Sequence, residues 1–264
     1  MALSAAAEGR SPALIPGRAD PSVYLHTDGW YYFSATVPEY DRLELRKARD
    51  IGGLAGAAPV VVWRRGKRDG DLWAPELHYI GSKWYIYYAA GTSRDPFDVR
   101  VRVLECGSPD PLAGPWKDLG KVDTGRDTLS LDATTFEFRG IRYLVWAQRP
   151  TKSAESPMDL YIAALRDPST LGSEAVMIGR ASQGWEMRDP KNLKMQGPAV
   201  LAREGRVFIA YSSNATDARY AVGLLEMPEG ADPLEPASWT KLPGPFLESD
   251  PSLALYGPGH NSFT

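Results

Sequence analysis

Five polar residues recur at near-regular intervals along the chain. Asp20, Glu76, Asp132, Gln196 and His260 are separated by 56, 56, 64 and 64 residues. If each opens an equivalent repeat, their side chains converge on one small volume. Neighbouring carboxyl groups can exchange protons with a substrate, which is general acid–base chemistry. Polar side chains also line any water-filled channel, so the repeat that positions these residues needs to be identified.

Four stretches place the first four of these residues at the start of a hairpin. Each pairs a short run with a turn and an aromatic or apolar strand; they span 19–35, 72–89, 131–147 and 195–212. The turns contain a glycine, which supplies the positive φ that tight hairpins require: Asp28-Gly29, Gly81-Ser82, Arg139-Gly140 and Glu204-Gly205. The sequence therefore predicts four hairpins in a repeating order.

Further strands follow each hairpin. The third strands are expected at 42–48, 99–106, 159–165 and 221–226, and the fourth at 59–64, 116–120, 174–178 and 239–241. Four short antiparallel strands in a repeating order are typical of a β-propeller blade, whereas a two-sheet sandwich does not predict that order. The spacing predicts an all-β, five-bladed β-propeller.

The fifth unit begins at His260, close to the last residue, Thr264. The fifth blade is therefore expected to be largely missing from this sequence, which is either a fragment lacking about 40 to 60 residues or a chain with another form of closure. The expected organisation is an N-terminal tail over 1–14 and a propeller domain over 15–264, with four blades and the start of a fifth.

Composition restricts the classes of partner. The 264 residues are 43% hydrophobic and 24% charged, with a net charge of −3, so a nucleic-acid partner is not expected. No apolar run reaches the roughly 18 residues of a membrane span, and no signal peptide is visible. We expect a cytoplasmic protein or a secreted one whose signal has been removed. The lone Cys106 and the three dispersed histidines predict neither a disulfide nor a structural zinc site.

Four motifs together resemble glycoside hydrolase family 43. They are Ala19-Asp20-Pro21, Trp73-Ala-Pro-Glu76, Leu131-Asp132-Ala-Thr-Thr-Phe136 and Gly257-Pro-Gly-His-Asn-Ser-Phe263. The resemblance extends from about Ile15 to the end of the chain. Segments 37–48 and 73–78 are most similar to the exo-α-L-arabinofuranosidase branch. The resemblance implies an inverting enzyme that releases L-arabinofuranose from arabinan or arabinose-containing oligosaccharides. A β-xylosidase, an endo-arabinanase and a non-catalytic sugar-binding propeller are the alternatives.

The resemblance implies a role for three residues. Asp20 is the expected general base that activates water, and Asp132 is expected to orient the acid and tune its pKa. The acid itself is expected at Gln196, where the family pattern has Glu before Gly-Pro. An amide can donate a hydrogen bond but cannot deliver a proton, so we expect impaired hydrolysis with sugar binding retained.

Three explanations for Gln196 remain open. It is an acid-to-amide substitution of the kind made to trap intact substrate, a natural feature of an attenuated paralogue, or the sign of a relocated acid. Glu186, in the preceding loop, and Glu204, in the hairpin turn, are the candidates for a relocated acid.

Trp73, Glu76 and His260 are the expected substrate-binding residues. Trp73 offers a flat wall for a sugar ring, with burial between blades as the alternative. Glu76 either contacts the sugar or supports its neighbours through an ion pair. His260 contacts substrate or helps hold an ion such as calcium in the channel, with a purely structural hydrogen bond as the alternative. No cofactor is expected to be required, and no protein-bound metal is assigned.

Overall fold

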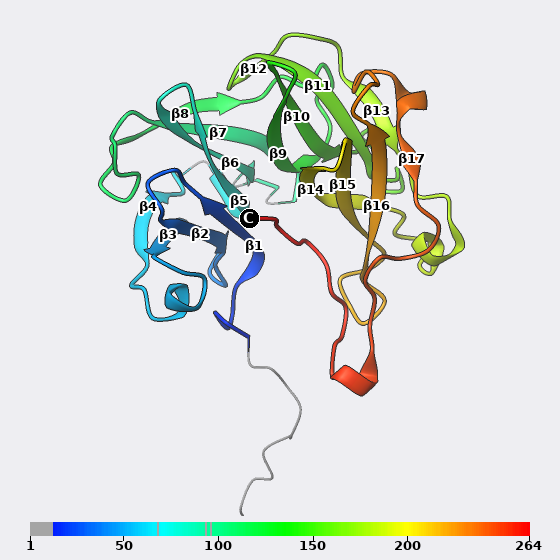
Figure 1. Ribbon diagram of the computed structural model, residues 1–264, viewed down its shortest axis with the longest axis horizontal. Coiled ribbons are helices and arrows are strands. Elements are labelled where there is room, and N and C mark those ends of the chain that lie inside the picture. Colours follow the sequence, from blue (N-terminus) through cyan, green and yellow to red (C-terminus); the bar gives the residue numbers. More distant parts are fainter. Residues whose placement is uncertain (1–12, 68, 93, 96) are drawn as a thin grey trace, which may run out of the picture.

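A computed structural model describes residues 13–67, 69–92, 94–95 and 97–264, and these residues form four antiparallel sheets arranged around a central axis (Figure 1). Most of the tail expected over 1–14 lies outside the described residues. Ile15 already packs against the core of the first sheet. The boundary at residue 15 stays a prediction.

The first two sheets each contain four strands in chain order. The first has β1 (Ala19–Leu25), β2 (Tyr31–Thr36), β3 (Arg42–Ala48) and β4 (Val60–Arg64). The second has β5 (Asp69–Ile80), β6 (Lys83–Thr92), β7 (Arg100–Cys106) and β8 (Trp116–Lys121). The innermost strands are β1 and β5.

The other two sheets follow the same plan. The third has β9 (Ser130–Phe138), β10 (Ile141–Gln148), β11 (Asp159–Asp167), β12 (Thr170–Leu171) and β13 (Val176–Gly179). The fourth has β14 (Met195–Arg203), β15 (Arg206–Ser213), β16 (Ala221–Pro228) and β17 (Thr240–Lys241). Four short 3-10 helices lie in the connections: Gly52–Ala55, Gly184–Met187, Pro236–Ser238 and Pro251–Leu253. None of the helices in the described residues is long and apolar enough to span a membrane.

The predicted propeller is confirmed, and its turns have the expected conformation. Arg139-Gly140 and Glu204-Gly205 have positive φ at both positions, as two-residue hairpins require. The sequence did not predict β12, a two-residue strand that pairs with the end of β11 and is called the β12 ribbon below. Short strands of this kind leave too weak an alternation to be detected in sequence.

The hydrophobic core lies between adjacent blades. Trp84 and Leu45 belong to the cluster between the first and second blades, Tyr87 and Trp146 to that between the second and third, and Tyr211 to that between the third and fourth. The second sheet has such a cluster on each face, which explains why β6 is buried along nearly its whole length.

At the fifth position of the ring, the described residues place only the last segment, 257–264. In Figure 1 this segment runs back to the centre, next to β1 and β14. The backbone N–H of His260 donates to Ser212 of β15 at 2.7 Å, and that of Val23 donates to Ser262 at 3.3 Å. Phe263 packs on the fourth blade. The segment therefore joins the fourth blade to the first.

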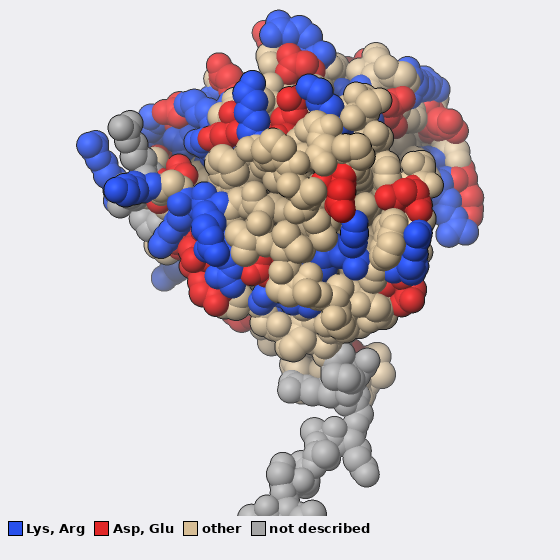
Figure 2. Space-filling view, turned by 90° about the vertical axis from the view of Figure 1, so that its left-hand side faces the viewer, with Lys and Arg blue, Asp and Glu red and all other residues tan. Residues whose placement is uncertain are grey.

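On the face beside β3 and β4, basic and acidic side chains are interspersed around an uncharged area (Figure 2).

Candidate active site

A β-bulge interrupts every innermost strand at the same level. The register of β1, β5 and β14 shifts between Ala19 and Ser22, Trp73 and Glu76, and Gln196 and Ala199, and β9 shifts at the corresponding point. One residue in each bulge, and one in the last segment, has left-handed φ: Asp20 (52°), Ala74 (48°), Asp132 (55°), Gly197 (57°) and His260 (47°). Such strain is concentrated where the surrounding structure fixes a side chain for function.

The bulges correct the register expected from sequence. Asp20, Asp132 and His260 do occupy equivalent positions, but Glu76 lies two residues beyond the equivalent of Asp20, and Gln196 lies one residue before it. A bulge adds a residue and re-aims the side chains around it. The expectation that all five residues share one register was therefore wrong for these two.

The bulges separate two layers of side chains on the axis. Residues at and just before the bulges line a cavity of about 460 Å³ at one end of the ring: Ala19, Asp20, Thr36, Tyr40, Asp71, Trp73, Phe97, Leu131, Asp132, Gln196 and Thr216. Residues after the bulges line a smaller cavity of about 210 Å³ deeper in the channel, and Glu76 is among them. The structure thus brings Asp20, Asp132, Gln196 and Trp73 together, and places Glu76 in the deeper layer beside His78, 3.1 Å away.

The Asp20 carboxylate is held from both sides. Thr36 donates its hydroxyl hydrogen to Oδ2 at 2.5 Å, and the same hydroxyl accepts the N–H of Ala74 at 2.7 Å. His260 Nδ1 lies 3.0 Å from Oδ1. Two neighbouring elements and the last segment therefore fix the orientation of one carboxylate.

Asp132 shares the same imidazole. Its Oδ2 accepts the N–H of Gly197 at 3.0 Å and lies 3.9 Å from His260 Nδ1. A Cβ at Gly197 would lie 3.0 Å from the ring of His260, and the φ of 57° is one that side chains rarely adopt, so glycine favours this close approach. His260 Nδ1 thus lies between the two carboxyl groups, closer to Asp20 than to Asp132.

These contacts separate the pKa values of the two carboxyl groups. Burial raises the pKa of Asp20, but the charge of His260 and the hydrogen bonds from His260 and Thr36 outweigh it, so this pKa lies below its usual value. Burial raises the pKa of Asp132 above its usual value, against the lowering effect of His260. Burial lowers the pKa of His260, but the charges of Asp132 and Asp20 outweigh burial, so this pKa lies above its usual value. At neutral pH the pair His260 and Asp20 is therefore an imidazolium and a carboxylate.

A pH dependence of stability follows from the raised pKa of His260. Its contribution is complete below the unfolded pKa of about 6.5 and is lost as pH rises towards the higher pKa of the folded state. We expect the difference in free energy of unfolding between the unmodified chain and His260→Gln to be larger at pH 6 than at pH 9. Urea denaturation at both pH values measures it, and a difference independent of pH would contradict the assignment.

Gln196 enters the cavity from the start of β14. Its Nε2 donates to the hydroxyl of Tyr220 at 2.9 Å, and Tyr220 is 7% exposed. A carboxylate at this position would accept the phenolic hydrogen instead, so the surroundings suit either an amide or a carboxyl group. Only the carboxyl group can release a proton.

Neither alternative acid lies in the cavity. Glu186 is fully buried in the fourth blade, where it accepts from the hydroxyl of Tyr211 at 2.6 Å and from Lys241 at 2.8 Å. Burial raises the pKa of Glu186, but hydrogen bonds from Gln183 and Lys241 bring it below its usual value. Glu204 lies in the β14–β15 turn with 77% of its side chain exposed. The relocated acid that the sequence left open is thus not found at either residue.

Glu186 is expected to be structural. Glu186→Gln would leave the nearly buried Lys241 without its counter-charge, a loss of about 3 to 5 kcal/mol for a buried pair. Glu204→Gln, which breaks an exposed pair with Arg203, is the matched control and should cost less than about 1 kcal/mol. Urea denaturation compares the two. Equal effects, or lost sugar affinity in a folded Glu186→Gln, would contradict this assignment.

A channel ion near His260 stays a prediction. Among residues 13–67, 69–92, 94–95 and 97–264, no group of three or more His, Cys, Asp or Glu side chains is arranged to hold a metal ion. The Nδ1 atom of His260 faces Asp20 as a proton donor, and a protonated nitrogen has no lone pair for a metal. Calcium prefers oxygen ligands, and the deeper cavity offers the carboxylate of Glu76 and the hydroxyl groups of Ser22 and Thr134.

Several cavity residues were not expected from sequence. Four of them line the cavity and one contacts Gln196: Thr36, Asp71, Tyr40 and Phe97, and the buried Tyr220. Thr36 ends a second strand and Phe97 lies in a loop, so neither belongs to the repeating inner-strand motif. The sequence holds no local signal for these residues, because the exposure of Phe97 and the placement of the others are set by the fold.

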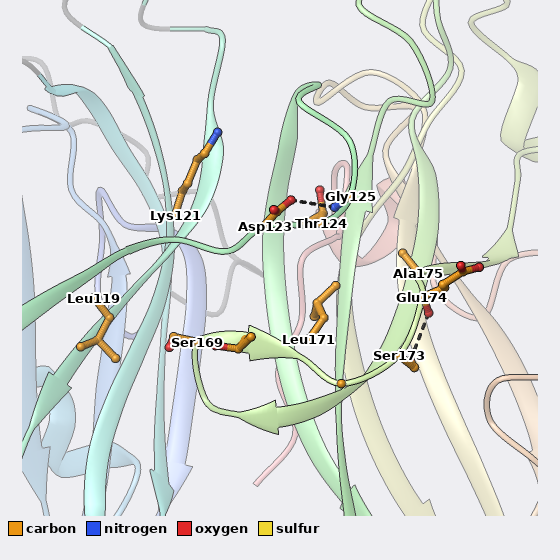
Figure 3. Close-up of a pocket in the computed structure, with 12 residues that line it drawn as sticks. Leu119, Lys121, Asp123, Thr124, Gly125, Ser169, Leu171, Ser173, Glu174 and Ala175 are labelled. Atoms are coloured by element: carbon orange, nitrogen blue, oxygen red, sulfur yellow. Dashed lines mark hydrogen bonds between the residues drawn. The ribbon is translucent and has the colours of Figure 1, made fainter.

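A larger cavity lies away from the axis. It has a volume of about 730 Å³, between β8 and the β12 ribbon (Figure 3). Its polar groups bond to one another: Gly125 N donates to Asp123 at 3.0 Å, and the Ser173 hydroxyl donates to the Glu174 carbonyl at 3.1 Å. It has no aromatic wall and no converging acids, so the smaller axial cavity is the candidate site.

Comparison with known proteins settles the family. The sequence profile described as "Glycosyl hydrolases family 43" matches residues 10–264. This chain belongs to family 43. The resemblance predicted from the motifs is thereby confirmed, including the arabinofuranosidase branch, because the relatives below carry that name.

Family 43 relatives are similar over nearly the whole chain. An α-L-arabinofuranosidase of Humicola insolens is 47% identical over all of this chain and 56% of its own length. An extracellular exo-α-(1→5)-L-arabinofuranosidase of Streptomyces chartreusis is 44% identical over 95% of this chain and 76% of its own length. The crystal structure of an α-L-arabinofuranosidase from Lactobacillus brevis has a TM-score of 0.90 at 42% identity, covering 96% of this chain and 81% of that chain. The chain spans about half the length of several curated relatives that it matches.

Proposed function

We propose that this chain is the propeller of an inverting, exo-acting α-L-arabinofuranosidase, with its acid position occupied by an amide. The observation that carries the proposal is the contact of His260 with Asp20 at 3.0 Å, which favours the carboxylate form of Asp20 at the edge of a cavity of about 460 Å³. The names of the family 43 relatives support arabinofuranosides as the substrate class, and two relatives are named as extracellular.

The proposed reaction needs one base and one acid. Asp20 takes a proton from water, and the resulting hydroxide forms a bond to the anomeric carbon as the glycosidic bond breaks. The leaving oxygen takes a proton from the group at position 196. Asp132 orients Gly197, beside the acid position, through the bond to its N–H. Gln196 cannot supply that proton, so the expected outcome is tight substrate positioning with slow turnover.

A sugar-binding propeller without catalysis is the second candidate. The amide of Gln196 favours it, because the side chain that donates to Tyr220 at the acid position has no proton to give to a leaving group. Both candidates bind the sugar. They differ in whether Gln196→Glu increases the rate of cleavage, which the first experiment of the Discussion measures.

Sugar binding by the unmodified chain tests the shared step. We expect calorimetry to detect binding of α-1,5-L-arabinotriose, and chromatography to find it largely uncleaved. Trp73→Ala should weaken binding by about tenfold, because the indole forms a wall of the cavity on which a sugar ring can stack. Xylotriose is the comparison ligand. Equal affinity for xylotriose would favour a β-xylosidase, and no affinity for either would reject the proposal.

A further inference from the structure

Tyr220 lies against the acid position, and no step of the proposed reaction uses it. Its side chain is 7% exposed, and its hydroxyl oxygen accepts a hydrogen bond from Nε2 of Gln196 at 2.9 Å. Gln196 is paired across the β14–β15 ladder with Ser212, whose side chain is a second hydrogen-bond partner of the Tyr220 hydroxyl. A buried phenol therefore contacts the position from which the leaving oxygen takes its proton.

The last segment of the chain fixes Tyr220 in this place. A Cβ at Gly259 would lie 2.1 Å from the ring of Tyr220, so the ring occupies the space that a side chain at this position would need. Ser212 is fully buried and accepts the backbone N–H of His260 at 2.7 Å. The segment that brings His260 into the site therefore also holds the phenol.

The surroundings of Tyr220 keep its hydroxyl protonated. Burial and the negative charges of Asp132 on β9 and Asp20 on β1 raise the pKa of Tyr220 above its usual value, against two hydrogen bonds to its oxygen. Two basic groups complete the surroundings of these carboxyl groups: His260 lies between them, and Lys194, just before β14, lies within the influence of Asp132. At neutral pH Tyr220 is therefore a phenol with one hydrogen to donate.

A phenol suits either side chain at position 196. Its oxygen accepts from an amide, as in this chain, and its hydrogen can be donated to a carboxylate. In the proposed reaction a carboxyl group at this position gives its proton to the leaving oxygen, which keeps the electron pair of the broken glycosidic bond. A carboxylate remains. We propose that Tyr220 positions the side chain at 196 and donates a hydrogen bond to this carboxylate as it forms. This inference rests on the proposed function.

The hydrogen bond should act on the rate rather than on the affinity. It strengthens as negative charge develops at position 196, so it stabilises the transition state more than the bound substrate. It also favours the ionised form of the carboxyl group, whose pKa should therefore rise when the phenolic hydroxyl is removed.

Tyr220→Phe in the Gln196→Glu background tests this role. The maximal kcat for arabinotriose should fall by about three- to tenfold with little change in KM, and the upper limb of kcat against pH should move up by about one unit. The loss should be smaller with 4-nitrophenyl α-L-arabinofuranoside. Tyr85→Phe is the matched control and should change none of these, because the buried Tyr85 donates to a carboxylate outside the site, that of Glu105 at 2.8 Å.

A second variant keeps the test decisive if Tyr220→Phe does not fold. Replacing Tyr220 by 3,5-difluorotyrosine retains the hydroxyl and nearly the same shape but makes the phenol a stronger donor, so the upper limb should move to lower pH. An upper limb that stays in place in every folded variant would overturn the inference, because a merely structural role leaves the pKa at position 196 unchanged. If Gln196→Glu binds arabinotriose without gaining turnover, the proposed function is wrong, and the inference with it.

Discussion

Gln196→Glu should increase the turnover of arabinotriose by a factor of about 10² to 10⁴, the usual contribution of a general acid. The introduced carboxyl group can bond to the hydroxyl of Tyr220, which already receives the amide at 2.9 Å, so the geometry of the cavity should be retained. The affinity for the sugar should change little. The gain should be smaller with 4-nitrophenyl α-L-arabinofuranoside, because nitrophenolate leaves with less need of a proton.

The matched control places a carboxyl group elsewhere in the same cavity. Thr216 also lines it, at an exposed position, and Thr216→Glu should give no comparable gain. Kinetics on both substrates, with calorimetry for affinity, measure the effect. If Gln196→Glu binds the sugar yet cleaves no faster than the unmodified chain, the propeller is a sugar-binding module and the enzymatic proposal is wrong.

The repeating hairpins made the fold predictable from sequence. Each hairpin has its own local signal, a glycine turn between apolar strands, and the inter-blade core requires only that both faces of each sheet be apolar. The position of Arg42–Ala48 as the third strand of its blade is the same in sequence and structure. The two-residue β12 ribbon was missed because its pairing depends on tertiary contacts rather than on local pattern.

The site was predictable only in part. Asp20 and Asp132 lie in motifs that a register count can align, and the structure brings both to His260. The bulges were not visible, because a left-handed Ala74 leaves no mark in sequence, and so Glu76 was placed in the wrong layer. Thr36 contacts Asp20 from a different strand, a contact that only the folded chain reveals.

Asp20→Asn in the Gln196→Glu background should lower the restored turnover number by a factor of about 10² to 10⁴, because an amide cannot deprotonate water. Asp71→Asn is the matched control, since Asp71 also lines the cavity but pairs with Arg65 at 3.0 Å rather than with His260. It should cost less than tenfold. Turnover of arabinotriose measures both.

Added azide distinguishes a base from a merely structural carboxylate at position 20. Azide forms a bond to the anomeric carbon without losing a proton, while the glycosidic bond breaks and the carboxyl group introduced at position 196 protonates the leaving oxygen. We therefore expect azide to restore turnover to Asp20→Asn in that background and to yield an arabinosyl azide of inverted configuration. Because His260 holds Asp20 as a carboxylate, the chemistry assigned to it is proton removal alone. A folded variant that azide does not rescue would show that Asp20 positions the sugar rather than activating water.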